Sequence, residues 1–273
     1  MNPLFRAFDR IAEVFNDLSL WKGECRVWDQ SMASPTFERW LYLRMHWLGL
    51  MGRDERVFLE AHVRPDMRVL DVGSNLGLYS VLMARLVGPG GRVICFEPEP
   101  DLFATLQRNR ALNSAGCIEG HNLALGSALA NLTLHRSVLN SGNNHLGQSK
   151  NDLFRRTITV EVVRLDTFLP DLVLDLVKID VEGWELEALR GMRRTLETNF
   201  GVQVYFEFSP LGYTRAGSTY EELITFLREV GFRIFDPIAR LELDDSAITR
   251  LAVCLDQKGY TNLVAARSSP WNM

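Results

Sequence analysis

The sequence predicts an α/β protein built on a doubly wound, mainly parallel sheet. From about Met67 onward, short β-rich runs alternate with helical patterns, which is the rhythm of parallel strands joined by crossover helices. Several of these runs, such as "RVICFEP" and "VQVYFEF", are apolar almost throughout, as expected for strands covered on both faces. The chain has 273 residues and is 47% hydrophobic, which is enough for a substantial buried core.

The predicted strands and helices follow one another in a regular order. The strands are "RVLDVG", "RVICFEP", "LDLVKID", "VQVYFEF", "FRIFDP" and "TNLVAAR". Helical patterns occupy residues 76–88, 100–113, 183–192 and 218–231. The last of these helices opens with Ser218 and Glu221 at the spacing of a capping box and closes on Gly231.

Two regions depart from this alternation. Between Ala124 and Asp166, alternating polar and apolar residues in "NLTLHRS" and "TITVEVVRLD" predict an inserted antiparallel β-hairpin, joined by the polar loop "VLNSGNNHLGQSK". The first sixty residues are rich in tryptophan and read as helical. We therefore expect an N-terminal helical cap over residues 1–60 and a single α/β domain over residues 61–273.

Composition narrows the class of protein. The net charge of −4 provides no basic field for a nucleic-acid backbone. The four cysteines are scattered without a C-x-x-C pair, which favours reduced, mostly buried thiols in a cytoplasmic protein. Charged residues interrupt both the apolar N-terminus and the run "WLYLRMHWLGLMG", so we expect neither a signal peptide nor a membrane span.

The stretch "VLDVGSNLGLYS" carries the first functional signal. Ligands of open parallel sheets bind beyond the carboxyl ends of the strands, and Gly73 and Gly77 would let the backbone turn there ahead of a helix. Dinucleotide sites need a middle glycine for the pyrophosphate, but this chain has Asn75. Asp71 would repel a phosphate and attract a cation. S-adenosylmethionine, with its ammonium and sulfonium groups, therefore fits better than NAD.

A second carboxylate, Glu97, closes the next strand about twenty residues later. A ribose presents two adjacent hydroxyl donors there, and an ionised carboxylate can accept from both. The alternatives are a solvated acid at a strand end for Asp71 and a charge at a helix N-terminus for Glu97.

These segments resemble the successive motifs of the FkbM-type S-adenosylmethionine-dependent methyltransferases. The resemblance rests on "VLDVGSNLGLYS", "VICFEPEP", "NLALGS", "SGNNHLG", "VVRLDTFL" and "LVKIDVEGWELEALRGM". It implies a class I methyltransferase (Rossmann-like) fold with a mainly parallel seven-stranded sheet whose last strand is antiparallel. It also implies methyl transfer, usually to a hydroxyl oxygen of a sugar or natural product. The residues that the resemblance places around the cofactor are Asp71, Gly73, Asn75, Gly77, Tyr79, Glu97, Asn122, Leu123 and Asp180.

Methyl transfer requires the protein to position the acceptor and, for a hydroxyl, to remove its proton. Asp180 ends the strand "LDLVKID", with Glu182 two residues later, and Glu207 nearly ends "VQVYFEF". His145 lies in the predicted polar loop, and the unperturbed titration range of histidine suits a base at neutral pH; the alternative is an ordinary solvated loop histidine. The other four histidines show no ligand spacing and are expected to be structural. We favour Asp180 as base or ligand and assign no metal, although the three carboxylates could also form a Mg²⁺ site.

The sequence thus predicts a cytoplasmic O-methyltransferase that uses S-adenosylmethionine and acts on a small molecule. One alternative is an N- or nucleic-acid methyltransferase of the same fold, but the chain has neither an N/D-P-P-Y/F motif nor a basic run. Another is a non-catalytic protein that binds the cofactor and serves as a partner. We expect a small-molecule acceptor, no nucleic acid and no membrane as partners, and a homo-oligomer is compatible with this prediction.

Overall fold

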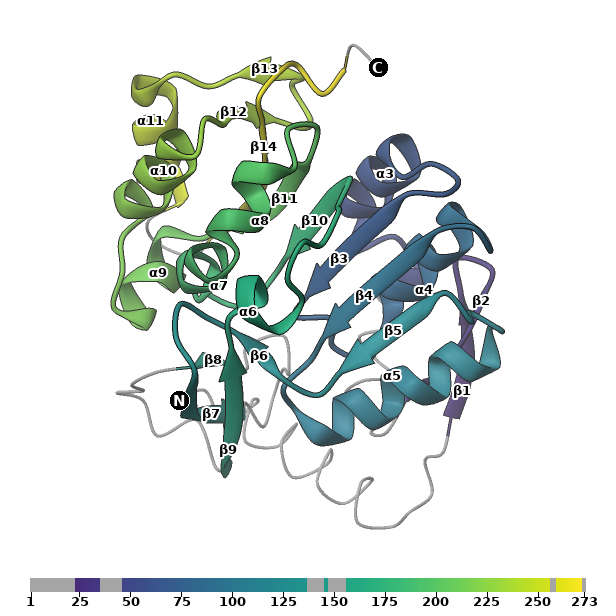
Figure 1. The fold of residues 1–273 in the computed structure, drawn as a ribbon. Helices are drawn as coiled ribbons and strands as arrows, with labels where there is room; N and C mark the ends of the chain where they lie inside the picture. The colour runs from purple at the N-terminus through teal and green to yellow at the C-terminus, as the bar shows by residue number, and fades with distance from the viewer. Residues whose placement is uncertain (1–22, 35–45, 137–144, 147–155, 256–258, 272–273) are drawn as a thin grey trace, which may run out of the picture.

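The computed structural model describes residues 23–34, 46–136, 145–146, 156–255 and 259–271. A central sheet organises this part of the chain (Figure 1). Its strands are β3 (Arg68–Val72), β4 (Arg92–Phe96), β5 (Ile118–His121), β10 (Leu176–Ile179), β11 (Gln203–Phe208), β12 (Arg233–Asp236), β13 (Leu241–Glu242) and β14 (Thr261–Ala266). They lie in the order β13-β12-β14-β11-β10-β3-β4-β5.

The strand pairing confirms a doubly wound, mainly parallel sheet. β10 and β4 flank β3, and both pair with it in parallel. From β3 the chain adds β4 and β5 on one side of the sheet. It then returns to the other side of β3, where it adds β10 and the strands that follow. β14 is antiparallel to β11, as the last strand of the predicted fold should be. Two strands were not found from the sequence pattern: β5, which is only four residues long, and β13, a two-residue edge strand.

Helices cover both faces of the sheet. On one face, α3 (Arg53–His62), α4 (Leu78–Val87) and α5 (Pro100–Leu112) share a buried cluster with Val69 and Val93. On the other, α7 (Glu185–Gly191), α8 (Arg193–Thr198), α10 (Tyr220–Glu229) and α11 (Asp245–Leu255) share a cluster with Leu70 and Ile94. Successive residues of one strand point to opposite faces, so apolar runs such as "RVICF" are needed to fill both layers.

The capping box of α10 is one residue away from its predicted position. Thr219, not Ser218, is the N-cap, and its side chain accepts from the backbone N–H of Glu222. The Glu222 carboxylate in turn accepts from the backbone N–H of Thr219, at 3.0 Å. Both pairs have the same spacing in the sequence, but the Ser218 hydroxyl donates to the Tyr213 carbonyl oxygen instead, at 3.4 Å.

The prediction of a helical N-terminal cap is wrong for residues 23–34. β1 (Gly23–Val27) and β2 (Gln30–Ser34) form an antiparallel hairpin. Its two turn residues, Trp28 and Asp29, both have positive φ, at 50° and 66°, as a tight two-residue hairpin turn requires. Asn109 of α5 accepts from the backbone N–H of Ala33 at 2.6 Å. The helical prediction is confirmed for α3, and the rest of the predicted cap, residues 1–22 and 35–45, lies outside the described residues.

The inserted antiparallel pair is confirmed. β7 (Ala130–Arg136) pairs with β9 (Arg156–Val163), and β6 (Ala124–Leu125) and β8 (His145–Leu146) complete a small sheet in the order β6-β9-β7-β8.

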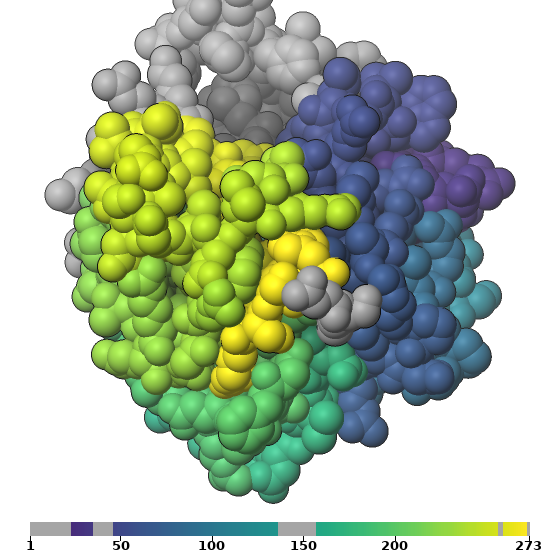
Figure 2. Space-filling model, turned by 90° about the horizontal axis from the view of Figure 1, so that it is seen from above, coloured from purple at the N-terminus to yellow at the C-terminus, as the bar shows by residue number. Residues whose placement is uncertain are grey.

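The C-terminal segment, yellow in Figure 2, is seen from above between the yellow-green part of the chain and the blue segment that carries α3. Trp271 in this segment lies 5.0 Å from the ring of His62, between ring centroids. Within the described ranges, no helix combines the length and apolar character needed to cross a membrane.

Candidate active site

A cavity of about 660 Å³ opens at the carboxyl edge of the central sheet. Its walls come from the loops after β3, β4, β10 and β11, from the small inserted sheet, and from the segment that leads into α3. The order of the strands reverses between β3 and β10, and crevices of open α/β sheets bind ligands at such a point. The cavity therefore lies where the fold predicts a ligand.

Gly73 and Gly77 shape the loop between β3 and α4. Both have positive φ, 81° and 86°, a conformation that side chains with a Cβ rarely adopt. A Cβ on Gly73 would also overlap the carbonyl oxygen of Asp180. The backbone N–H groups of Gly73 and Ser74 both donate to the carbonyl oxygen of Phe96, at 3.0 and 3.1 Å. The loop is thus held against the ends of two neighbouring strands.

Glu97 follows β4 and lines the cavity, with 6% of its surface exposed. Its two carboxylate oxygens accept from the backbone N–H groups of Asn75, at 2.8 Å, and Glu99, at 2.9 Å. Asn122 is exposed and donates to the carbonyl oxygen of Glu97 at 2.8 Å. Leu123 lines the cavity beside it. Glu97, expected at the ribose, and Asn122 and Leu123, expected beside the adenine, therefore lie close together, with Asn122 supporting the backbone of Glu97.

Asp71 lies beneath the cavity rather than facing it as the sequence suggested. It is fully buried, and its carboxylate accepts from the Ser80 hydroxyl at 2.6 Å. The Nζ atom of Lys178 lies 3.7 Å from the other carboxylate oxygen. Burial raises the pKa of Asp71, although the Lys178 ammonium acts in the opposite direction. At this position Lys178, not Asp71, is among the residues that line the cavity.

Lys178 was missed as a site residue. It is 2% exposed, and its Nζ atom also lies 3.4 Å from Asp180 Oδ2. Burial acts to lower the pKa of this ammonium, but the carboxylates of Asp180 and Asp71 outweigh that effect, and the pKa is raised. The signal in the sequence was a lone charge inside the apolar strand "LDLVKID". A buried charge of this kind requires a partner.

Aromatic side chains form the wall on the N-terminal side. The Tyr79 ring lies 5.0 Å from the Lys178 ammonium, a cation–π distance. The Tyr79 hydroxyl lies 3.3 Å from Nε2 of His46. His46 was expected to be only structural, yet it is one of the residues that line the cavity. Its position depends on tertiary packing against Trp28, whose Nε1 donates to the His46 carbonyl oxygen at 3.2 Å.

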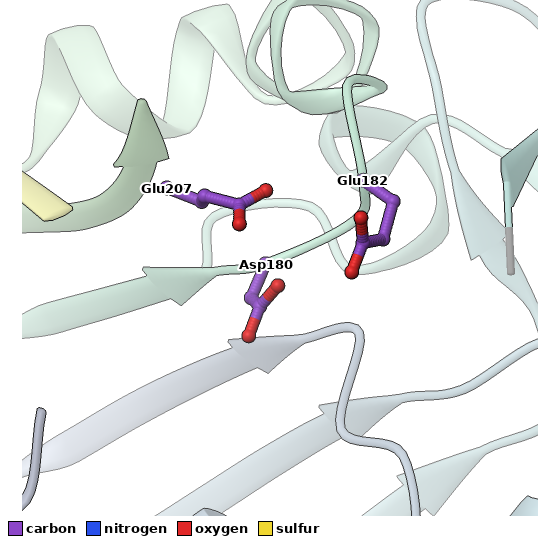
Figure 3. A group of neighbouring side chains, drawn as sticks. All are labelled: Asp180, Glu182 and Glu207. Atoms are coloured by element: carbon purple, nitrogen blue, oxygen red, sulfur yellow. The ribbon is translucent and has the colours of Figure 1, made fainter. Parts of the chain in front are cut away.

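Three predicted catalytic carboxylates meet where β10 and β11 end, across β3 from Glu97. One carboxylate oxygen from each of Asp180, Glu182 and Glu207 lies within 4.8 Å of the other two. Figure 3 shows Glu207 and Glu182 reaching toward one another, with Asp180 between and below them, near the ends of two neighbouring strands. Glu182 has a positive φ of 54° and Gly183 one of 100°, so a tight turn after β10 brings Glu182 back to the cavity.

Burial and mutual repulsion act on the acids of this region. Burial, followed by the nearby Asp180 carboxylate, raises the pKa of both Glu182 and Glu207 well above the ordinary value. Glu185, three residues after Glu182, is fully buried. Its burial raises its pKa to about 7. These three carboxyls therefore keep their protons to a higher pH than exposed carboxyls do.

The remaining candidate base, His145, is placed only through its backbone. It begins the short strand β8 and pairs with His135 of β7, so its backbone is not in an open loop as predicted. Its side chain lies outside the described residues, and its role as a base stays a prediction. Ser209 lines the cavity but caps α9 (Pro210–Ala216), accepting from the Gly212 backbone N–H at 3.3 Å.

The sequence of this chain is similar to those of several known methyltransferases. Methyltransferase 1 of Beauveria bassiana is 33% identical over 147 residues, which are 46% of this chain and 59% of that protein. The hexuronic acid methyltransferase AglP of Haloferax volcanii is 28% identical over 162 residues, 59% of this chain and 64% of that protein. The chain thus matches about three fifths of the length of each relative.

Among solved structures, Aeropyrum pernix fibrillarin in complex with S-adenosyl-L-methionine is 15% identical and has a TM-score of 0.44. The alignment covers 78% of this chain and 74% of fibrillarin.

The family known as the methyltransferase FkbM domain matches residues 71–234. That range is more than half of the chain, and it runs from β3, which precedes the glycine loop, to β12. The matched range contains the glycine loop, Glu97, Lys178 and the three clustered carboxylates. The chain belongs to the FkbM family of S-adenosylmethionine-dependent methyltransferases.

Proposed function

We propose that this protein transfers a methyl group from S-adenosylmethionine to a hydroxyl oxygen of a small molecule, such as a sugar or another natural product. The observation that carries the proposal is one cavity with two differently built ends. Glu97 follows β4 on one side of β3, and Asp180, Glu182 and Glu207 lie at the ends of β10 and β11 on the other side. The name of the relative AglP, a hexuronic acid methyltransferase, supports a sugar-like acceptor.

The Glu97 end suits the nucleoside of the cofactor. Two backbone N–H groups already orient the Glu97 carboxylate, and an ionised carboxylate has about four acceptor positions. A carboxylate of this kind, lining the cavity, suits the two hydroxyl groups of a ribose as donors. Phe96, Leu102 and Leu123 line the same part of the cavity and would pack against an adenine ring.

The acidic end suits the acceptor. When bound, S-adenosylmethionine supplies a methyl group that its sulfonium already activates for in-line displacement. The protein must then hold the hydroxyl oxygen in line and receive its proton. We assign the proton to the carboxylate cluster, with Asp180 as the first candidate. It ends a central strand, its side chain is 43% exposed, and Lys178 holds it in place.

Calorimetric titration with S-adenosylhomocysteine, the demethylated cofactor, tests the cofactor assignment. We expect Glu97→Ala to weaken binding by about 1–3 kcal/mol, because it removes charged hydrogen bonds to the ligand. Glu161→Ala, at an exposed position of β9, serves as a control and should bind normally. Binding of NADH in place of the sulfur ligand would overturn the assignment.

A further inference from the structure

The carboxylates of Asp180, Glu182 and Glu207 form a compact oxygen cluster inside the cavity. One oxygen from each residue lies within 4.8 Å of the others. Two ligand oxygens on opposite sides of an ion are separated by about 4.2 Å around Mg²⁺ and about 4.8 Å around Ca²⁺. The three oxygens are therefore close enough together for one divalent cation to contact all of them once the side chains adjust around it.

A second observation concerns Glu207 alone. Its side chain points into the cluster (Figure 3), and the residue is only 6% exposed. Its Oε2 atom is buried and accepts no hydrogen bond within the described part of the chain. A buried carboxylate oxygen without a partner is costly. Glu207 also lines the cavity, so a ligand bound among the three carboxylates would supply the partner that this oxygen lacks.

The charge balance around the cluster points the same way. Glu55 lines the same cavity, and the fully buried Glu185 lies behind Glu182, with its Oε2 atom also lacking a hydrogen bond in the described ranges. On the positive side, Lys178 and Arg215 line the cavity. The Lys178 charge is shared between Asp180 and Asp71. Acidic side chains therefore outnumber basic ones among the residues that line the cavity.

We propose that Asp180, Glu182 and Glu207 bind one divalent metal cation of the hard, oxygen-preferring type represented by Mg²⁺. Carboxylate oxygens from two or three protein residues, completed by water and substrate oxygens, are the usual ligands of this ion. The cation compensates the excess negative charge and gives the buried Glu207 oxygen its partner. The binding of the cation does not depend on the proposed function.

The role of the cation in the reaction does rest on the proposed function. An acceptor hydroxyl that coordinates the cation loses its proton more readily. The proton passes to a carboxylate oxygen that does not bind the ion, or to water. The oxygen then forms its bond to the methyl carbon as the carbon–sulfur bond breaks, and the sulfur leaves as a neutral thioether. A carboxylate can bind the cation through one oxygen and accept the proton on the other.

Titration of the full chain with Mn²⁺, followed by electron paramagnetic resonance, tests the proposal without any turnover. We expect one Mn²⁺ per chain, displaced by Mg²⁺ or Ca²⁺. Glu207→Gln and Glu182→Gln should each weaken Mn²⁺ binding about tenfold or more. Glu229→Gln, on the exposed side chain of α10 that pairs with Arg193, is the matched control and should bind Mn²⁺ normally.

Circular dichroism and S-adenosylhomocysteine titration of the same samples separate the outcomes. If Glu207→Gln fails to fold, the half-buried Glu182 supplies the decisive variant. Absence of Mn²⁺ binding at millimolar concentration, or equal Mn²⁺ affinity in the wild type and in the folded cluster variants, would overturn the cation site. Mn²⁺ binding without any binding of S-adenosylhomocysteine would support the cation site and count against the proposed function.

Discussion

At the scale of single residues, Lys178 connects the floor of the cavity with its acidic wall. Its ammonium lies between a fully buried aspartate, Asp71, and a cavity-facing one, Asp180. Parallel pairing of β10 with β3 places Lys178 opposite Asp71 in the sheet. The pair is therefore built into the strand register, and a change at Lys178 affects both the stability of the sheet and the position of Asp180.

We expect Lys178→Met to destabilise the fold by about 3–5 kcal/mol, because it leaves the Asp71 carboxylate buried without its cation. Urea denaturation measures the free energy of unfolding. The double variant Lys178→Met with Asp71→Asn should recover part of the loss, since it removes the unpaired charge as well. A loss below about 1 kcal/mol in the single variant would show that the ion pair is unimportant.

Gly73 offers a second test at this scale. A Cβ at this position would overlap the Asp180 carbonyl oxygen, whereas one on Gly217 would meet no atom within 4 Å. Both glycines have similar positive φ, 81° and 87°. Gly217→Ala should therefore cost only the conformational strain, about 1–2 kcal/mol. Gly73→Ala should cost more and weaken S-adenosylhomocysteine binding. Equal unfolding free energies and ligand affinities in the two variants would contradict the close approach.

At the scale of secondary-structure elements, both the local sequence and contacts with neighbouring residues determine where α10 begins. The sequence around α10 offers two overlapping capping boxes, Ser218–Glu221 and Thr219–Glu222. The structure uses the second, while the Ser218 hydroxyl donates to the Tyr213 carbonyl oxygen at 3.4 Å. Ser218 is thus part of the turn that follows α9.

Substitution of the two hydroxyl residues distinguishes the capping boxes. Thr219→Ala should lower the free energy of unfolding by about 1 kcal/mol, the usual value of an N-cap side chain. Ser218→Ala should cost less, because its hydrogen bond is long and partly exposed. Thermal or urea denaturation measures both changes. A larger loss for Ser218→Ala would mean that the helix begins one residue earlier.

At the scale of the whole molecule, the N-terminal hairpin belongs to the core of the sheet domain. Val27 and Met32 are fully buried in the cluster that contains Leu76 and Leu82. Trp28 in the hairpin turn contacts His46, which lines the cavity. The division into a cap over residues 1–60 and a domain over residues 61–273 stays a prediction, but the hairpin shares its apolar contacts with the domain.

Met32→Ala should therefore destabilise the whole protein by about 2–5 kcal/mol, as large-to-small substitutions in cores do. Leu129→Ala, at a side chain that is 76% exposed, is the control and should change the free energy of unfolding by less than about 0.5 kcal/mol. A single cooperative transition in both variants would show that hairpin and sheet unfold together. A neutral Met32→Ala would place the hairpin outside the cooperative unit.

The sequence by itself determined the features that depend on short stretches of chain. These are the alternating strands and helices, the glycine loop, and the acids at strand ends, all of which follow from local periodicity and from the turn chemistry of glycine. It placed Glu97, Asp180 and Glu207 on the ligand-binding edge because parallel strands end together there. The antiparallel pair of β7 and β9 could be predicted for the same reason, since its alternation is local.

Only the tertiary structure decided which side chains meet. The sequence separated Asp71 from Lys178 by more than a hundred residues, and their contact comes from the pairing of β3 with β10. His46 reached the cavity through packing against Trp28 and Tyr79. Residues 23–34 form a hairpin despite an apparent helical pattern, because β1 pairs with β2 and the backbone of Ala33 hydrogen-bonds to Asn109 of α5. Burial and hydrogen bonding between distant segments outweigh local preference, since each such contact is worth as much as several residues of propensity.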